Sequence, residues 1–375
     1  RVHSIVTVPA GVLAGGALGG VAVLGTGEPA ETTLGRVVDH PPPYQGTAFL
    51  ARFRDDDGSL RWARQPAGAR YEEAADVDAT ADGDVVVLGN GVGAVTFAAG
   101  EPDAITLPAE SEYQQRMFLS RHDGATGRLE WVVATSGSGR AEASAVAVLP
   151  WGRLAVVGTM DGQVIFGPGE PGETTLYDGG EWATVNTAFL AEFNGDGTLF
   201  RAQVLGRGHS SYGWGIAVAP DGALAVTGGF SHTVEFLRRT PYATVLTSIA
   251  YSDDVYVLVV GPARELEWLS RDGGPGEDLG ATVVFLADGA LAVVGRFMGD
   301  GALFGEDEVR LDGYLGETTS PFDGWVAVYE RCGRLRWAQQ VTGPGADHIV
   351  RVAASPDGAM VAAGVLGESL SLADG

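Results

Sequence analysis

"VAPDGALAVTG", residues 218–228, sets two apolar runs on either side of a Pro-Asp-Gly turn. Asp-Gly between apolar runs is a strong signal for a tight turn that joins two antiparallel strands. The same pattern returns as "FLADGALAVVG" at 285–295 and "ASPDGAMVAAG" at 354–364. Weaker copies are "ATADGDVVVLG" at 79–89, "VLPWGRLAVVG" at 148–158 and "TVPAGVLAGG" at 7–16. The chain therefore consists of repeats, each with this strand-turn-strand unit.

The glycines of these turns set the length of the repeat. They are Gly11, Gly83, Gly152, Gly222, Gly289 and Gly358, which lie 72, 69, 70, 67 and 69 residues apart. A second landmark, the last residue of motifs such as "GRLEW", falls at Trp62, Trp131, Arg201, Trp268 and Trp337, always 21 residues before the next turn glycine. Two landmarks with the same spacing predict a structural repeat of about 69 residues.

Each repeat contains four short strand-like segments. The two strands of the Asp-Gly hairpin are followed by a third, such as "AFLAEF" at 188–193, and by a fourth that carries the tryptophan landmark. No segment keeps a helical period over eleven or more residues, so the pattern predicts an all-β chain. Repeated four-stranded antiparallel sheets cover both of their faces by radial stacking, which predicts a β-propeller with one sheet per blade.

The predicted organisation is a single propeller domain over residues 1–375. Its repeats run approximately over 4–73, 74–143, 144–214, 215–280 and 281–348, with a partial repeat at 349–375. We expect six blades with the last one incomplete; a five-bladed ring with an appended hairpin is the alternative. Because the chain begins with Arg1 and not with Met, we expect it to be a processed or trimmed piece of a longer protein.

Composition excludes several classes of function. A formal net charge of −24 and a pI near 4.5 would repel nucleic acids and anionic membrane surfaces. The sequence contains no lysine, which excludes Schiff-base chemistry, and its single cysteine, Cys332, excludes an intrachain disulfide. Residues 6–24 are uncharged, but Pro9 and several glycines, together with their alignment to later repeats, predict strands and no transmembrane segment.

The repeat resembles a known family. The pattern "AFLAEFNGDGTLFRA" at 188–202, followed by "GWGIAVAPDGALAVTGGF" at 213–230, is similar to the bacterial β-propeller repeat called SBBP and to related Asp-Gly propeller repeats of large bacterial surface proteins. The resemblance covers essentially the whole chain. It implies an extracellular, cell-surface or periplasmic bacterial protein, and it brings no catalytic residues with it.

Polar residues just before the first strands form the candidate site. His3, His209 and His348 are predicted to share one position there, and acidic residues fall nearby in the repeat. In propellers this connection runs toward one mouth of the central channel, where ligands gather. A polar or metal-binding rim is the functional interpretation, and hydrated loop residues at different heights are the alternative. The candidate residues are His3, Glu73, His209, Asp278, Asp347 and His348.

Acidic turns raise the question of calcium. "RDDDGSL" at 54–60 and "NGDGTL" at 194–199 cluster carboxylates, but they lack the twelve-residue ligand spacing of a calcium loop. We predict plain turns, with weak calcium binding as the alternative and no other cofactor.

The octet "GEPAETTL" at 27–34, with copies at 100–107 and 169–176, places Glu28 and Glu31 in an E-x-x-E spacing. Pro29 argues against a helix, so the octet is predicted to be the solvent-facing tip of a hairpin between strands two and three.

Tryptophans and one further motif are also candidates for contacts. "DGATGRLEW" at 123–131 resembles the docking signature of quinoprotein propellers, but the other repeats lack it. The landmark tryptophans are predicted to pack between blades because their position is fixed in the repeat. Trp151, Trp182 and Trp214 lie elsewhere and are predicted to be exposed contacts.

Two functional hypotheses follow. Regular repeats, variable loops and the lack of a catalytic motif favour a non-enzymatic binding or scaffold module for a protein or carbohydrate ligand. The alternative is a propeller enzyme, either a quinoprotein-like oxidoreductase or a metal-dependent hydrolase, with its site at the channel mouth. That alternative requires acidic or histidine side chains from three or more repeats to converge.

Overall fold

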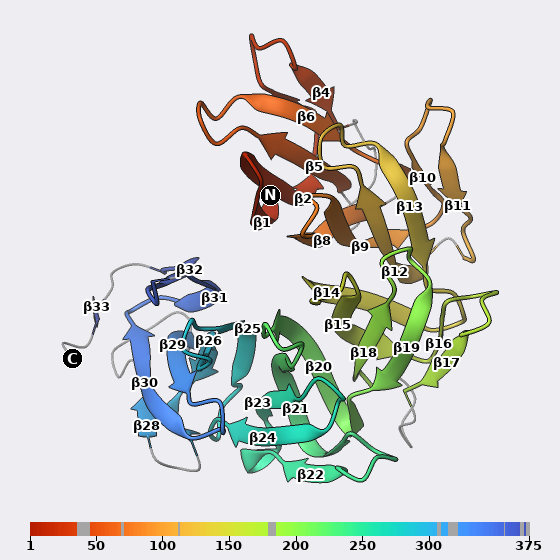
Figure 1. Cartoon of the computed structure of the whole chain (residues 1–375). Coiled ribbons are helices and arrows are strands. Elements are labelled where there is room, and N and C mark those ends of the chain that lie inside the picture. Colours follow the sequence, from red (N-terminus) through yellow and green to blue (C-terminus); the bar gives the residue numbers. More distant parts are fainter. Residues whose placement is uncertain are drawn as a thin grey trace. The chain divides into compact units, whose positions relative to one another are not determined.

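In the described part of the chain, the computed structural model consists of antiparallel strands joined by turns and loops, with a 3₁₀ turn at Ile249–Tyr251 (Figure 1). The structure describes residues 1–35, 46–68, 71–111, 113–178, 185–305, 309–313, 322–355, 357–367 and 371–372. The predicted all-β class is confirmed. Within the described part of the chain, no helix is long and apolar enough to cross a membrane, and residues 6–24 form strands and turns as predicted.

Five sheets share one topology. In each of them the four main strands of a repeat pair with one another in sequence order, and the short strands of the inserted hairpin are not counted. The sheets are β1 (Val2–Val8), β2 (Gly11–Leu18), β5 (Thr47–Phe53) and β6 (Leu60–Arg64); β8 (Tyr71–Ala79), β9 (Val85–Val92), β12 (Gln115–His122) and β13 (Leu129–Ala134); β14 (Arg140–Val148), β15 (Leu154–Asp161), β18 (Thr187–Phe193) and β19 (Leu199–Val204); β20 (Gly206–Val218), β21 (Leu224–Phe236), β23 (Asp253–Val260) and β24 (Leu266–Asp272); β25 (Leu279–Phe285), β26 (Leu291–Met298), β29 (Phe322–Tyr329) and β30 (Leu335–Thr342). A sixth, two-stranded sheet pairs β31 (His348–Ala354) with β32 (Met360–Val365), and β33 (Ser371–Leu372) extends the fifth sheet beside β30.

The chain divides into two compact units. One contains Arg1–Tyr177 and Leu190–Gln203, and the other contains Asp178–Phe189 and Val204–Gly375. The first unit holds the first two sheets and most of the third, and the second unit holds the later sheets.

Inserted hairpins lie between the second and third strands of every four-stranded sheet, as predicted. They are β3 (Ala22–Leu24) with β4 (Thr32–Leu34), β10 (Val95–Phe97) with β11 (Ile105–Leu107), β16 (Gln163–Phe166) with β17 (Thr174–Tyr177), the end of β21 with β22 (Thr244–Thr247), and β27 (Asp300–Phe304) with β28 (Val309–Asp312). The second hairpin also pairs with β7 (Ala67–Gly68). Aromatic rings attach three of these hairpins to the third strand, with centroids 5.0 Å apart for Phe97–Phe118, 4.7 Å for Phe236–Tyr256 and 4.8 Å for Phe304–Trp325.

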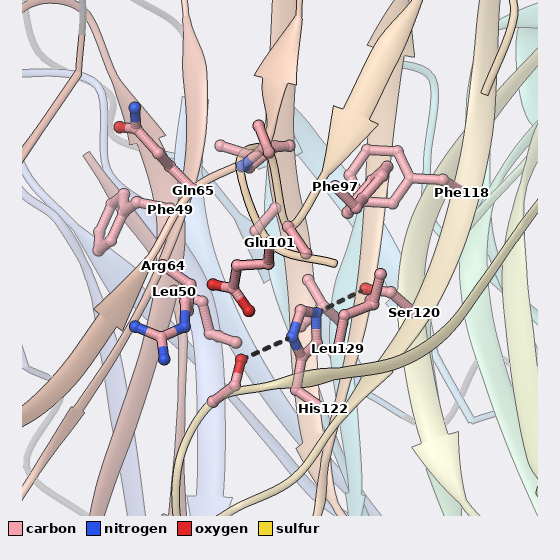
Figure 2. Close-up of a pocket in the computed structure, with 17 residues that line it drawn as sticks. Phe49, Leu50, Arg64, Gln65, Phe97, Glu101, Phe118, Ser120, His122 and Leu129 are labelled. Carbon is pink, nitrogen blue, oxygen red and sulfur yellow. Dashed lines mark hydrogen bonds between the residues drawn. The ribbon is translucent and has the colours of Figure 1, made fainter. Parts of the chain in front are cut away.

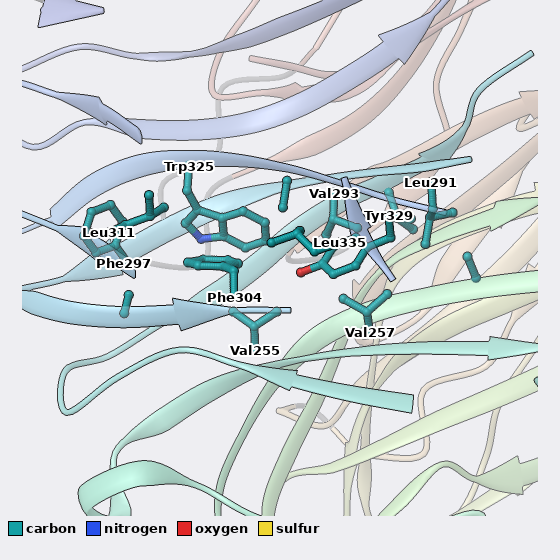
Figure 3. Close-up of a cluster of buried hydrophobic side chains, with 14 of the residues drawn as sticks. Val255, Val257, Leu291, Val293, Phe297, Phe304, Leu311, Trp325, Tyr329 and Leu335 are labelled. Carbon is teal, nitrogen blue, oxygen red and sulfur yellow. The ribbon is translucent and has the colours of Figure 1, made fainter. Parts of the chain in front are cut away.

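The core of the second unit shows how the sheets pack. Figure 3 shows Trp325 of β29 beside Phe304 of its hairpin, with Val255 and Val257 of the preceding sheet close by. Trp325, Phe304 and Val257 are completely buried. Each apolar side chain buried in this way contributes about 2–3 kcal/mol, so packing between neighbouring sheets is a main source of stability.

Three landmark tryptophans join neighbouring sheets, as predicted. The indole Nε1–H donates to a carbonyl oxygen of the next sheet at 3.1 Å for Trp62 to Gly124, 3.1 Å for Trp131 to Gly195 and 2.8 Å for Trp268 to Arg331. Trp337 of the fifth sheet does not fit the prediction, since 37% of it is exposed. In the described residues the sixth sheet consists of its first two strands, so it offers no third-to-fourth strand turn for Trp337 to contact.

The octet forms hairpin loops, but the prediction that it is wholly solvent-facing is wrong. Glu28 Oε2 accepts a hydrogen bond from Leu60 N at 2.6 Å, and Glu170 Oε2 accepts one from Leu199 N at 2.6 Å. These carboxylates therefore attach the loop to the start of the fourth strand. Glu31 is exposed and accepts from Gly27 N within the loop at 2.6 Å.

Candidate functional site

A one-residue bulge interrupts the first strand of each of the six repeat sheets. The register shifts fall at His3, Ala75, Ser144, Trp214, Ala281 and Val350. A bulge breaks the alternation of side chains and re-aims them, and bulges are frequent beside functional sites. The predicted site residues lie close to these bulges.

In the first unit the structure brings His3 and Glu73 together. His3 Nδ1 lies 3.1 Å from Ala74 O and 3.8 Å from Glu73 Oε2. Glu73 also accepts hydrogen bonds from the Tyr71 hydroxyl and, at 3.0 Å, from Asn90 Nδ2. His3 and Glu73 are each partly exposed, so this pair lies at the surface.

Asn90 connects this pair to the next sheet. Its amide nitrogen donates to Ala143 O at 3.0 Å, and its amide oxygen accepts from Ala143 N at 2.8 Å. Glu142, the neighbour of Ala143, has a raised pKa because of burial, with the nearby Glu73 charge adding to the effect. Carboxylates from two sheets thus share one polar region of the first unit.

In the second unit Asp278 and Asp347 are buried, which corrects their assignment to an exposed rim. Asp278 Oδ2 accepts from Gly274 N at 2.5 Å, and its Oδ1 accepts from Met298 N at 3.2 Å. Asp347 Oδ1 accepts from Gly367 N at 3.0 Å. Both residues are fully buried, so these carboxylates satisfy backbone amides inside the fold and are not available to an external ligand.

Asp278 forms a second buried acidic group with Asp254. Asp254 accepts from Ile249 N at 2.9 Å. Burial raises the pKa of each carboxyl to about 7, and the nearby Asp254 adds to the shift of Asp278. The two side chains therefore titrate in the neutral range.

The three histidines occupy different positions, so the prediction that they share one is wrong. His3 is the bulge residue of β1, His348 lies two residues before the bulge of β31, and His209 lies at a second bulge of β20. His209 stacks on His232 with ring centroids 3.8 Å apart. Burial lowers the pKa of His348. Strand register, which the spacing of landmarks does not reveal, separates these side chains.

Metal ligands do not gather in the described ranges: no group of three or more His, Cys, Asp or Glu residues there could hold an ion. The acidic turns have local hydrogen bonds, since Asp57 Oδ1 accepts from Ser59 N at 2.8 Å and Asp196 Oδ1 accepts from Thr198 N at 3.1 Å. In the quinoprotein-like motif, Asp123 Oδ1 likewise accepts from Thr126 N at 2.7 Å. These contacts explain the turns, and calcium binding stays a prediction.

The turns between the first and second strands carry ion pairs in several sheets. Arg121 lies 2.6 Å from Asp84 and 2.9 Å from Glu130, and Arg336 lies 2.7 Å from Asp288. A further pair joins Arg331 to Asp221 at 3.3 Å. Charged side chains therefore cover this end of the second, fourth and fifth sheets.

The third sheet has aromatic residues at two positions where most of the other sheets have charged ones. Trp151 replaces the aspartate of the Asp-Gly turn, and Phe200 replaces the arginine or glutamate that follows the first leucine of the fourth strand. Trp151 is 80% exposed and has a φ of +78°, in a turn closed by Gly152 N donating to Leu149 O at 3.1 Å. A bulky residue at positive φ is strained. We call Trp151, Arg153 and Phe200 the aromatic patch; the Arg153 guanidinium lies 3.6 Å from the centre of the Phe200 ring.

The other two tryptophans that lie off the repeat position differ from Trp151. Trp214 is half-buried and stacks on Tyr212 with centroids 5.3 Å apart, and Trp182 lies outside the described residues. Of the three predicted contacts, Trp151 is the one that the structure describes as exposed.

A cavity of about 90 Å³ lies in the first unit, between the first and second sheets and the β10–β11 hairpin. Figure 2 shows Phe97, Phe118 and Leu129 on one side of it, with Glu101 directed between Arg64 and His122. Ser120 and His122 are buried in the wall, 3.1 Å apart between Oγ and Nε2, and His122 Nδ1 lies 3.2 Å from Gly127 O. Burial lowers the pKa of His122 to about 4, so the ring is neutral at pH 7.

Sequence reasoning missed this cavity, although a signal exists. The third strands of the first and third repeats read "AFLARF" and "AFLAEF", whereas the second reads "MFLSRH". Ser120 and His122 thus replace alanine and phenylalanine at positions that point into the core. A polar exception in an otherwise apolar repeat position marks the place where a repeat differs in its interior.

Comparison with known proteins supports the architecture. No family model matches the chain. Over 192 residues, which are 50% of this chain and 14% of the relative, it is 22% identical to an uncharacterized WD repeat-containing protein, L264, of Acanthamoeba polyphaga mimivirus. The similarity and the five four-stranded sheets agree on a β-propeller-type repeat.

Proposed function

We propose that the chain is a non-enzymatic β-propeller-type module that binds a protein partner through the aromatic patch. The observation that carries the proposal is Trp151, an exposed tryptophan at positive φ in a turn where four of the other five repeats have aspartate. An exposed, strained aromatic costs stability, and such features cluster at functional sites.

The composition of the patch favours a protein partner. Trp and Arg are the residue types that dominate the energetics of protein interfaces. The Arg153 guanidinium already covers the Phe200 ring, which leaves Trp151 as the free aromatic face of the patch. A carbohydrate, the alternative class of ligand, needs several polar groups around the stacking ring, and the patch supplies one cation. The WD-repeat similarity supports the same class of function.

The resemblance to SBBP-type repeats supports a secreted or cell-surface location, and we propose that location for the protein. Large bacterial surface proteins use such repeats as extracellular modules. The acidic surface, with a net charge of −24, suits a soluble module that meets its partner outside the cell.

The test is a selection of peptides from a display library on the wild-type protein, followed by calorimetry on variants. Trp151→Asp introduces the turn residue of four other repeats, so we expect it to fold and to bind selected peptides at least about 30-fold more weakly, as for a hot spot of about 2 kcal/mol. Tyr177→Asp removes another exposed aromatic, which is 56% exposed, and should leave affinity unchanged. Equal loss in both variants, or none in either, would contradict the proposal; glycan-array binding that Trp151→Asp abolishes would replace protein with carbohydrate as the ligand.

A further inference from the structure

The β10–β11 hairpin sits differently on its sheet from its counterparts. At the equivalent position three of the other four hairpins have Gly25, Gly167 and Gly305, with φ of +63°, +61° and +65°, whereas the β21–β22 hairpin has Leu237, with a φ of +52°. A Cβ at these glycines would lie 2.8 Å from Leu60 Cβ, 2.8 Å from Leu199 Cβ and 2.4 Å from Leu335 Cβ, respectively. These hairpins are therefore pressed against the leucine that begins the fourth strand, at a distance that excludes any side chain larger than hydrogen.

The second sheet has Ala98 at this position, with a φ of +53°. Its methyl group cannot occupy the space next to Leu129 that a glycine leaves empty, so the base of the hairpin stands off from the sheet. The consequence is seen at Glu101, the counterpart of Glu28 and Glu170. In this part of the described structure Glu101 makes no side-chain hydrogen bond, whereas Glu28 and Glu170 bind the corresponding leucine amides at 2.6 Å.

The space opened in this way is the cavity of about 90 Å³, and Ala98, Glu101 and Leu129 all line it. Phe97 and Phe118 meet edge to face at 5.0 Å and form its aromatic wall. A cavity of roughly 150 Å³ accepts benzene, so this smaller, open one suits a single ring whose polar end projects at the mouth. It is too small for a cofactor, since such pockets begin at about 300 Å³.

The polar groups of the cavity restrict the chemistry of the ligand. Ser120 and His122 are hydrogen-bonded to each other, and His122 also to Gly127 O, so they leave no free N–H. Arg64 donates through Nη2 to Thr126 O at 2.7 Å, its buried Nε–H has no hydrogen-bond partner, and its charge opposes a cation. Glu101 and the net charge of −24 oppose an anion. The acceptor left open at the mouth is the Glu101 carboxylate, which calls for a neutral donor.

We propose that this cavity binds a neutral aromatic ring with one O–H or N–H donor, of the phenol or indole class, and that Ala98 is the residue that creates the site. The ring lies against Phe97 and Phe118, and its donor binds the Glu101 carboxylate. The site is separate from the aromatic patch and does not depend on the proposed function. A free phenol and a tyrosine side chain present the same chemistry.

The test uses saturation-transfer NMR and calorimetry with p-cresol and 3-methylindole as probes. We expect both to bind the wild-type protein, and toluene, which has no donor, to bind at least 5-fold more weakly. Glu101→Ala should remove that preference. A blocked pentapeptide with a central tyrosine distinguishes the two sources: tighter binding of the peptide assigns the site to a partner side chain, and tighter binding of p-cresol assigns it to a free small molecule.

Ala98→Gly is the decisive variant because it gives the hairpin base the glycine found in three of its four counterparts. We expect the hairpin to close, p-cresol binding to fall at least 10-fold, and the Leu129 amide to exchange with solvent at least 10-fold more slowly as Glu101 accepts its hydrogen bond. Gly83→Ala, a change at another positive-φ position with no atom within 3.4 Å of its Cβ, is the matched control and should leave the p-cresol affinity unchanged.

Several results would overturn the proposal. They are undetectable p-cresol binding to the wild type, equal affinity for toluene, or full p-cresol binding by a folded Ala98→Gly protein. Trp151→Asp should bind p-cresol as the wild type does, so a failure of the proposed function leaves this result intact and can be told apart from it.

Discussion

The ring of Trp62 lies directly against Gly127 of the next sheet, where a Cβ would come within 2.7 Å of the indole. Gly197 and Gly333 stand in the same relation to Trp131 and Trp268, at 2.9 Å each. The residue after the turn of one sheet thus has to be glycine because the tryptophan of the preceding sheet covers it. This contact joins the tryptophan landmark of one repeat to the turn between the third and fourth strands of the next.

Gly127→Ala should therefore destabilise the protein beyond the cost of its backbone conformation. Overpacking of this kind costs about 1–3 kcal/mol, and positive φ adds about 1 kcal/mol. Gly58→Ala is the matched control, because Gly58 has the same φ of +71° but no atom within 4 Å of its Cβ. Urea denaturation should show Gly127→Ala to be less stable than Gly58→Ala by at least about 1 kcal/mol; equal midpoints would show that the tryptophan contact carries no energy.

Truncation of the exposed Trp337 should cost less stability than truncation of the buried Trp62. Trp62 is 5% exposed and contacts the next sheet, whereas Trp337 is 37% exposed. We expect Trp62→Ala to cost about 3–5 kcal/mol, as truncation of a buried aromatic does, and Trp337→Ala to cost less than half of that. The unfolding free energies of the two variants measure the difference. Similar losses would contradict the exposure of Trp337 and show that its side chain is covered in the folded protein.

The sequence predicted the strands well because alternation, Asp-Gly turns and a fixed period act within each repeat. It did not predict the cavity, because the cavity depends on where the Ala98 methyl group falls relative to Leu129, a contact between segments about 30 residues apart. It also placed Asp278 at the surface. A carboxylate next to a strand end resembles a rim residue in sequence, and only the fold shows that backbone amides surround it.

The buried Asp254–Asp278 pair predicts an unusual dependence of stability on pH. Burial raises both pKa values to about 7, above the ordinary 3.8, and neighbouring carboxylates add to each shift: Asp253 and Asp272 for Asp254, and Asp254 for Asp278. Between these values the folded chain holds protons that the unfolded chain releases, so stability contributed by the pair is present below pH 4 and is lost as pH rises through 7. Glu277, which also faces Asp278, acts in the same direction.

Asp278→Asn tests this dependence. Relative to the wild type, the variant should gain thermal stability between pH 5 and pH 8, because asparagine stays neutral there. Carboxyls with lowered pKa values, such as Asp123 and Asp288, change the pH dependence of stability below pH 4. They do so equally in the wild type and the variant, so their effect cancels when the two proteins are compared. Melting temperatures measured from pH 4 to pH 8 should diverge as pH rises, and parallel curves would show that Asp278 is ionised across this range.

Variants of the octet carboxylates can distinguish a carboxylate that makes a structural hydrogen bond from one that only adds surface charge. Glu28 accepts the Leu60 amide hydrogen bond at 2.6 Å, while its counterpart Glu101 makes no such bond to Leu129 in the described structure. We expect Glu28→Ala to lower the free energy of unfolding by about 1–2 kcal/mol, because an amide loses a charged acceptor. Glu101→Ala should change it by less than about 0.5 kcal/mol, as exposed substitutions usually do. Glu28→Gln keeps an acceptor oxygen, so its loss in free energy of unfolding should lie between those of Glu28→Ala and Glu101→Ala. If all three variants unfold at the same urea concentration, the Glu28 hydrogen bond contributes nothing to stability and the octet is only a solvent-facing loop.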